Sequence, residues 1–318
     1  MANHRSRCAV VALGGNAISP VNEPDSIANQ FQHTRESLGA VIALVKRNYN
    51  LAITHGNGPQ VGIALRRVEL SRGKLPTSPL GVLVADTQGS MGYMIEQSLM
   101  NRLSIEHIDR PVVTIITQVL VDEQDPALKL PSKFIGPVYS QKEASNYMLQ
   151  QKWMMKPYND PDKWRRVVGS PTPLGIVNRR TIREQVQSGV IVVASGGGGI
   201  PVYRDPAKGL EGVDAVIDKD RAAAILAHDI EANELIILTE VDSVYLDFGK
   251  PTRRRIPTMR IGEAARHLEA GEFPEGSMGP KIEAAIAFVR GGGDRTIICG
   301  LHSIEAAITG QAGTEIVP

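Results

Sequence analysis

The sequence predicts an α/β protein, a three-layer αβα sandwich around an open, mainly parallel sheet with a small protruding lid subdomain. Short apolar runs alternate along the chain with longer amphipathic segments, which is the order of βα units. Most of these runs are continuously apolar, as in parallel strands that are covered on both faces. Glycine-rich turns follow several of the runs, at the position where open α/β sheets bind ligands.

The expected elements follow from these periodicities in chain order. The expected strands are Cys8–Leu13, Leu51–Thr54, Val112–Thr117, Val190–Ala194, Leu235–Leu238 and Thr296–Cys299. The expected helices are Thr34–Lys46, Gly62–Ser71, Gly89–Leu103, Arg180–Gln187, Arg221–His228, Ile261–Ala270 and Ile282–Val289. Residues from about 125 to 173 break this rhythm with clustered Pro, Lys, Trp and Tyr, and Gln141–Gln151 is their one clear helical stretch. A long excursion of this kind is typical of a functional insertion, so we expect a protruding lid here.

Composition excludes several classes of function. The 318 residues carry 35 basic and 34 acidic side chains, so neither nucleic acid nor a membrane surface is an expected partner. Cys8 and Cys299 are the only cysteines, too few for a disulfide framework or a paired-cysteine metal site. The run from Met1 to Arg7 lacks the apolar core of a signal peptide, and we expect a cytoplasmic protein.

Four glycine-rich turns favour an anion site. They are Leu13–Ala17, Thr54–Gln60, Ser195–Pro201 and Gly276–Lys281. Glycine lets backbone N–H groups approach an anion without a Cβ in the way. One such turn is more often only a connection between a strand and a helix, whereas four turns at comparable positions favour a shared ligand. The GxGxxxG spacing that starts at Gly56 lacks the acidic residue of a dinucleotide site, and the sequence has no Walker A match.

Two lysines point to phosphoryl transfer. Lys281 and Lys219 each stand between a tight turn and an Ala-rich helical pattern. An ammonium suits phosphate oxygens, and a helix N-terminus adds free N–H groups at the same place. An alternative for the second lysine is an exposed turn in which Asp220 caps the next helix. His55 could be a ligand or a base, although a lone histidine at a strand end is more often structural.

The motifs as a set resemble carbamate kinases of the amino-acid kinase fold. They are VVALGGNAI (Val10–Ile18), THGNGPQVG (Thr54–Gly62), TQGSMGY (Thr87–Tyr93), KFIGP (Lys133–Pro137), GGGGIPV (Gly196–Val202), VIDKD (Val216–Asp220) and GSMGPK (Gly276–Lys281). The resemblance runs in order from about Val10 to the C-terminus. It implies a homodimer that uses MgATP and catalyses ATP + carbamate ⇌ ADP + carbamoyl phosphate. It also implies a single domain, with a carbamate and phosphoryl lobe over residues 1–210 and a nucleotide lobe over 211–318.

The resemblance also implies the site residues. The expected catalytic residues are Lys133, Lys219, Asp220 and Lys281. The expected phosphoryl and carbamate contacts are Gly14, Gly15, Asn16, Gly56, Asn57, Gly58, Gly197 and Gly198. Asp242, Tyr245, Met278, Gly279 and Pro280 are expected to frame adenine and ribose. Mg²⁺ is expected to be held mainly by phosphates and water, with no dedicated protein ligands.

Two features complete these expectations. Members of the fold often carry a lysine on the first strand, but Ala12 and Leu13 stand there, as in carbamate kinases. The resemblance implies that Lys133 of the lid takes the place of that lysine. Residues 159–164 read NDPDKW, where many carbamate kinases have Asp-Ala-Gly-Arg-Gly. Together with KFIGPVY (Lys133–Tyr139), this segment resembles carbamate kinases of purine-ureide (allantoin) breakdown more than those of arginine fermentation. The rival hypotheses are a kinase for another small carboxylate or phosphonate, and a silent nucleotide sensor on the same fold.

Overall fold

The central layer is a large, mainly parallel sheet. The structure is a computed structural model that describes residues 7–15, 18, 26–274 and 276–318. The strand order is β15-β17-β16-β12-β1-β2-β9-β3, and only β16 and β17 pair antiparallel among these neighbours. The strands are β1 (Cys8–Leu13), β2 (Asn50–His55), β3 (Val112–Ile115), β9 (Ile191–Ala194), β12 (Glu234–Thr239), β15 (Thr258–Arg260), β16 (Arg295–Gly300) and β17 (Thr314–Val317).

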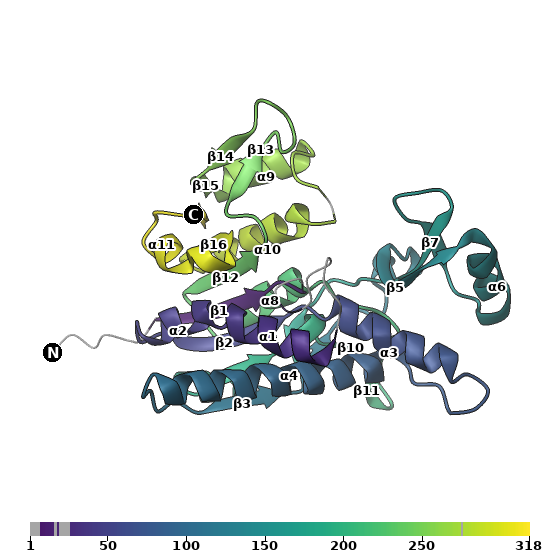
Figure 1. Cartoon of the computed structure of the whole chain (residues 1–318). Helices are drawn as coiled ribbons and strands as arrows, with labels where there is room; N and C mark the ends of the chain where they lie inside the picture. Colours follow the sequence, from purple (N-terminus) through teal and green to yellow (C-terminus); the bar gives the residue numbers. More distant parts are fainter. Residues whose placement is uncertain (1–6, 16–17, 19–25, 275) are drawn as a thin grey trace.

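Helices cover both faces of this sheet (Figure 1). Alternate residues of β1 enter two different cores: Val10 and Ala12 pack with Ala223 and Ile282, whereas the core on the other face includes Val11. Because successive strand side chains point to opposite faces, a strand buried on both sides must be apolar throughout. The helices are α1 (Ile27–Ser37), α2 (Gly39–Val45), α3 (Gly58–Leu70), α4 (Leu80–Ile105), α7 (Arg179–Gln187), α8 (Lys219–Asp229), α9 (Ile261–Glu269), α10 (Met278–Arg290) and α11 (Ile304–Ile308). The predicted αβα sandwich is confirmed.

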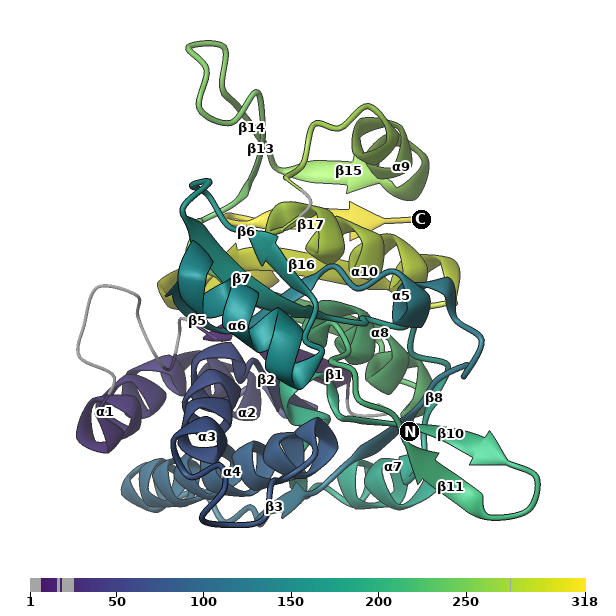
Figure 2. The same ribbon diagram turned by 90° about the vertical axis from the view of Figure 1, so that its right-hand side faces the viewer.

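A smaller sheet stands away from this body, in front of it in Figure 2. Its strands are β5 (Lys133–Ser140), β6 (Met155–Pro157) and β7 (Lys163–Val168), in the order β5-β7-β6. The helix α6 (Gln141–Gln151) packs on this sheet and begins with a capping box between Ser140 and Glu143. We call residues 133–168 the lid subdomain. Its strands could not be predicted from sequence periodicity, because the segment is mostly polar or aromatic.

The remaining elements connect these layers. They are β4 (Gln118–Leu120), α5 (Pro126–Lys129), β8 (Gly175–Ile176), the 3-10 turn η2 (Gly196–Gly198), β10 (Ile200–Asp205), β11 (Gly209–Gly212), β13 (Val244–Leu246), β14 (Arg254–Ile256) and the 3-10 turn η3 (Leu301–Ser303). The hairpins β10–β11 and β13–β14 are antiparallel. Among the described helices, none combines the length and the apolar character that crossing a bilayer requires.

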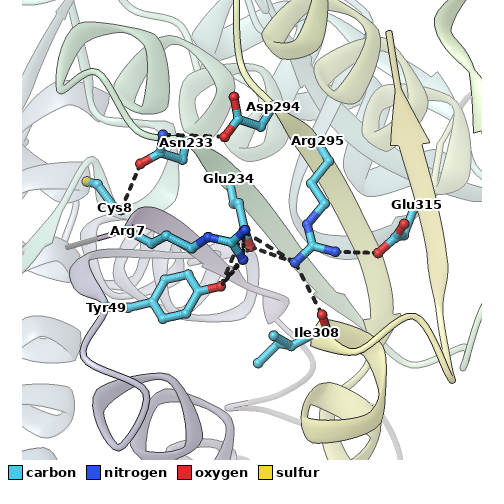
Figure 3. A network of polar contacts seen from close by, with 9 residues as sticks. All are labelled: Arg7, Cys8, Tyr49, Asn233, Glu234, Asp294, Arg295, Ile308 and Glu315. Atoms are coloured by element: carbon cyan, nitrogen blue, oxygen red, sulfur yellow. Dashed lines mark hydrogen bonds and ion pairs between the residues drawn. The ribbon is translucent and has the colours of Figure 1, made fainter. Parts of the chain in front are cut away.

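A buried ionic network ties the amino ends of the central strands together (Figure 3). Glu234, 1% exposed at the start of β12, accepts hydrogen bonds from Tyr49 Oη at 3.2 Å and from Arg295 at 3.3 Å. Arg7 approaches the same carboxylate at 3.2 Å, and Arg295 also pairs with Glu315 of β17. Several partners therefore share one buried charge, as a buried carboxylate requires. This network lies at the opposite end of the sheet from the functional site, which lies at the carboxyl ends of the strands.

Candidate functional site

The carboxyl ends of β1 and β12 open onto a cavity of about 610 Å³. At its wall, Gly14 and Gly15 follow β1, Thr239 ends β12, and Glu240 and Asp242 follow β12. The other lining residues are Lys219, Leu238, Gly276, Ser277, Lys281, Gly300, Leu301, His302 and Ser303. A second hollow of about 290 Å³ shares Thr239, Glu240, Ser277 and Lys281 with it. The site therefore lies where open parallel sheets bind ligands.

Two helices begin at this cavity, each with a lysine in its first turn. Lys219 is the first residue of α8, and Lys281 lies in the first turn of α10. Both ammonium groups contact Asp220, with Nζ–Oδ distances of 2.5 Å from Lys219 and 3.0 Å from Lys281. Their side chains are 13% and 15% exposed. Two cations and two helix N-termini thus face one cavity, which makes it strongly attractive to anions.

Asp220 is buried between its lysines, with 4% of the residue exposed. Burial by itself raises the pKa of this carboxyl, but Lys219 and Lys281 outweigh burial and hold the pKa below its ordinary value. The group is therefore an ionised bridge at neutral pH. The alternative in which Asp220 caps the following helix is wrong, because Asp218 is the N-cap and Asp220 lies inside the first turn. Asp218 was not predicted as a site residue.

Lys133 reaches the start of α8 from the lid subdomain. It is the first residue of β5, and its Nζ lies 2.7 Å from Oδ2 of Asp218. Asp218 precedes α8 directly and accepts hydrogen bonds from the backbone N–H groups of Asp220 and Arg221. The lysine therefore approaches the start of the same helix that carries Lys219 and Asp220. It is not among the residues that line the two hollows.

The turns after β1 and β2 are packed against each other. A Cβ added to Gly56 would lie 2.8 Å from the backbone N of Gly15 and 3.6 Å from Cδ of Lys219. Asn57 is 4% exposed, and its amide donates to Thr87 Oγ1 at 2.9 Å. Gly58 begins α3 and has open space around it. Gly56 therefore packs against Gly15 and Lys219, while Asn16 lies outside the described residues.

The third glycine turn packs closely against the turn after β2 and against the segment before α8. Gly197 and Gly198 have positive φ of 65° and 92°. A Cβ on Gly197 would lie 2.1 Å from the Asn57 amide, and one on Gly198 would lie 2.4 Å from the Ile217 carbonyl oxygen. Neither glycine lines the two hollows. Glycine is required here both for φ and for close approach.

His55 is built into the scaffold as a neutral side chain. It is 1% exposed, and its Nδ1 lies 3.1 Å from the Gly56 carbonyl oxygen. Burial chiefly lowers its pKa, to about 4, and Lys219 lowers it further against the opposing Gly56 hydrogen bond. Of the three roles considered from the sequence, which were ligand, base and structural residue, the geometry favours the structural one.

The residues expected around adenine lie on one side of the site. Tyr245 and Met278 line the smaller hollow, and Asp242 lines the larger one. The Tyr245 hydroxyl donates to the Asp242 carboxylate at 2.9 Å, and the Arg253 guanidinium lies 4.1 Å from the Tyr245 ring centroid. Gly279 and Pro280 lie in the first turn of α10 and line neither hollow. Leu301, His302 and Ser303 were missed, because nothing in their sequence marks them as lining residues.

Replacing Gly56 with alanine is expected to lower the thermal unfolding temperature by several degrees. The new methyl group meets backbone atoms of Gly15 at 2.8–2.9 Å, and relieving such overpacking costs about 1–3 kcal/mol. Gly58→Ala is the matched control, because its Cβ would meet nothing within 4 Å. Circular dichroism melts check both variants. Equal melting temperatures for wild type and Gly56→Ala would contradict this packing.

The fold and this site together define a class of protein: an α/β protein with two lysine-bearing helix N-termini aimed at an anion-binding cavity. The amino acid kinase family matches residues 7–300 of the chain. The carbamate kinase of Pyrococcus horikoshii is 41% identical over 312 residues, covering 97% of this chain and 98% of the relative. The carbamate kinase of Halobacterium salinarum is 44% identical over the same length, with the same coverage. A carbamate kinase-like protein of Escherichia coli is 41% identical, again with that coverage.

Solved structures agree with these relatives. The carbamate kinase from Giardia lamblia bound to AMP-PNP superposes with a TM-score of 0.92 at 35% identity, covering 98% of each chain. A structure from Aeropyrum pernix gives a TM-score of 0.93 at 38% identity, covering 98% of this chain and 99% of the other. The chain belongs to the amino acid kinase family, and within it to the carbamate kinases. The resemblance drawn from the motifs is confirmed.

Proposed function

We propose that the protein catalyses reversible phosphoryl transfer between ATP and carbamate, which gives ADP and carbamoyl phosphate. The observation that carries this proposal is the Lys219–Asp220–Lys281 cluster, which lies at the N-termini of two helices. The cluster borders a cavity large enough for a nucleotide. The named relatives support the choice of carbamate as the acceptor. Membership in a kinase family supports ATP as the co-substrate.

Catalysis in this site is proposed to consist of positioning and electrostatic stabilisation. Carbamate is already an anion and needs no base to become nucleophilic, so the difficulty is to bring two anions together. Lys219 and Lys281 supply positive charge on fixed helix ends, and Asp220 holds the two ammonium groups apart and oriented. His55 is buried and neutral. The chain is therefore proposed to use a preorganised cationic pocket, with neither His55 nor Asp220 acting as a proton acceptor.

The proposed sub-sites follow the geometry. Gly14 and Gly15 are proposed to hold the transferred phosphoryl through backbone N–H groups, with Gly56, Asn57 and Gly58 on the carbamate side and Gly197 and Gly198 supporting them. The adenosine part is proposed to lie against Asp242, Tyr245 and Met278, beside Gly279 and Pro280. This keeps the proposed division into lobes at residues 1–210 and 211–318, with Lys219 and Lys281 at their junction.

Mg²⁺ is proposed to enter with the nucleotide. Within the described ranges, no group of three or more His, Cys, Asp or Glu side chains is arranged to hold a metal ion. The ion prefers octahedral oxygen ligands and keeps several waters, so phosphate oxygens are suitable ligands. When bound, it would neutralise charge between the β- and γ-phosphates. The carboxylates of Glu240 and Asp242, both at the cavity wall, are proposed to bind its water shell.

The proposal is tested by measuring ATP formation from ADP and carbamoyl phosphate, with hexokinase coupling as the readout. ATP formation that requires both substrates would support it. No ATP from carbamoyl phosphate, but ADP release with another small carboxylate or phosphonate, would support the first rival function. Nucleotide binding without turnover of any acceptor would support a silent sensor.

Exchanging Asp220 for asparagine is expected to lower turnover by about tenfold, since the lysines lose the charge that orients them. The acidic limb of the pH–rate profile is expected to stay where it is in the wild type. The reason is that the pKa of Asp220 already lies below its ordinary value, so the carboxylate does not titrate near neutral pH. Rate profiles from about pH 5 to 9 measure this. A limb that disappears with the substitution would instead make Asp220 a titrating catalyst.

We also propose a cytoplasmic homodimer that works toward ATP synthesis in nitrogen catabolism, from arginine or allantoin. The dimer proposal is supported by the end strand β3 and the adjacent face of α4. There, Tyr93, Met100 and Ile116 are 58%, 51% and 44% exposed and line a hollow of about 500 Å³. Exposed large apolar side chains gathered on one face are typical of an interface. Light scattering at assay concentration gives the mass that decides between one chain and two.

A further inference from the structure

One carboxylate links the lid subdomain to the start of α8. The Asp218 Oδ2 atom accepts a hydrogen bond from Lys133 Nζ at 2.7 Å. Its other oxygen, Oδ1, accepts from the backbone N–H groups of Asp220 at 2.9 Å and of Arg221 at 3.4 Å. Lys133 and Asp218 are 85 residues apart in sequence. Asp218 therefore does two separate things: it caps a helix, and it holds a lysine of another part of the molecule.

Within this ion pair, the Asp218 side chain is less exposed to solvent than the Lys133 side chain. The Asp218 side chain is 13% exposed and that of Lys133 is 37% exposed. Burial by itself raises the pKa of the Asp218 carboxyl, but the charge and hydrogen bond of Lys133 lower it to about 2. A carboxylate that stays ionised in a shielded position keeps a firm hold on its ammonium partner.

Other contacts attach the lid subdomain to the body without approaching the cavity. Tyr139 Oη donates to Glu69 of α3 at 2.9 Å, and Arg166 pairs with Asp214 at 3.3 Å. Neither Glu69 nor Asp214 lines the two hollows at the sheet edge. Among these lid contacts, the one at Asp218 is the one that reaches the helix start carrying Lys219 and Asp220.

We propose that Asp218 is a positioning residue for the reaction, which holds Lys133 ready at the phosphoryl site. The inference rests on the proposed function for its kinetic consequence. Because Asp220 lies two residues further on and holds Lys219 and Lys281, two carboxylates at the start of one helix place all three lysines. An ammonium on a flexible four-carbon stem contributes most when its position is fixed before the substrate arrives.

Asp218→Asn separates the two roles of this side chain. Asparagine caps helices about as well as aspartate, so α8 should keep its start while Lys133 loses its charged partner. Turnover is expected to fall about tenfold with KM for ADP within about twofold of wild type, because the loss affects only the positioning of Lys133. The matched control is Asp125→Asn. Asp125 is also an N-cap, bonded to the Ala127 and Thr172 N–H groups, and its variant should match wild type. Turnover of Asp218→Asn at the wild-type level would overturn the proposal.

A double-mutant cycle tests whether Asp218 acts through Lys133. In the Lys133→Ala background, Asp218→Asn is expected to cost less than about twofold further, because the group it positions is already gone. Full additivity of the two losses would overturn the proposal. A purely structural role would instead lower the melting temperature equally in both backgrounds and leave the cycle additive.

Hydrogen–deuterium exchange gives a readout that does not depend on activity. Amides of Lys133–Ser140 are expected to exchange faster in Asp218→Asn than in wild type, whereas those of Met278–Arg290 should be unchanged. Unchanged exchange in Lys133–Ser140 would overturn the positioning role. If the wild type makes no ATP from carbamoyl phosphate, the proposed function fails by itself, and the exchange result still decides whether Asp218 holds the lid lysine.

Discussion

Replacing Lys281 or Lys219 with alanine is expected to lower turnover by at least about 100-fold, since deleting one charge from a preorganised site costs on the order of 3 kcal/mol. Both ammonium groups line the cavity at the sheet edge, and both lie within 3.0 Å of Asp220. Each variant leaves Asp220 one lysine partner, so the buried carboxylate stays paired and the fold should survive. The measurement is turnover in ATP formation at saturating ADP and carbamoyl phosphate.

Lys250→Ala is the matched control for these two variants. Lys250 also pairs with an aspartate, Asp247, at 2.8 Å, but its side chain is 65% exposed and it lines neither hollow. Exposed pairs contribute little, so its turnover should equal that of wild type. Melting curves for the purified variants exclude unfolding as the cause of any loss. Turnover within about threefold of wild type for either Lys219→Ala or Lys281→Ala would remove these lysines from the phosphoryl site.

The central strands could be predicted because their signal is local. The run Cys8–Leu13 is buried at every position, and a strand covered on both faces needs continuous apolar residues. The strand Thr314–Val317 was missed because its place in the sheet depends on antiparallel pairing with Arg295–Gly300 and parallel pairing with Thr258–Arg260. Pairing between distant segments leaves no pattern within four residues of sequence.

Helix boundaries were harder to predict than helices. The expected helix Thr34–Lys46 is two helices that meet at Leu38, where the apolar pattern continues although the helix does not. The expected helix at Gly89 starts at Leu80 instead, directly after Pro79. Burial of Leu83 and Val84 in the cluster between α3 and α4 outweighs the weak helix propensity of the glycines that follow.

The cluster of Lys219, Asp220 and Lys281 could be anticipated because each lysine follows a turn at the start of a helical pattern. The partner of Lys133 could not. Asp-Lys-Asp offers two acids as possible caps, and which one caps depends on the residue at which the helix begins. Since α8 begins at Lys219, the first acid becomes the cap and is left with one oxygen for Lys133. That geometry comes from the fold of a distant segment, the lid subdomain.

Lys133→Ala is the second large expected effect, with turnover falling by about 100-fold while the affinity for ADP stays within about threefold. The lysine stands at the start of β5 and contacts Asp218, whereas Asp242, Tyr245 and Met278 form a separate part of the site. In the functional interpretation, the lid subdomain delivers this ammonium to the transferring phosphoryl and replaces the lysine absent from β1. In the alternative, Lys133 is a partly exposed lid residue, and substitution changes turnover by less than about twofold.

Lys133→Arg distinguishes a point charge from positive charge in general. A planar guanidinium is longer and donates in a fixed fork, so it reproduces neither the 2.7 Å contact with Asp218 nor a compact approach to a phosphoryl oxygen. Arginine is therefore expected to recover less than about a tenth of the wild-type turnover. Turnover and ADP affinity, the latter from calorimetry, are measured on the same preparations. Equal losses in both would place Lys133 in the nucleotide site, and the delivery of this lysine by the lid would be refuted.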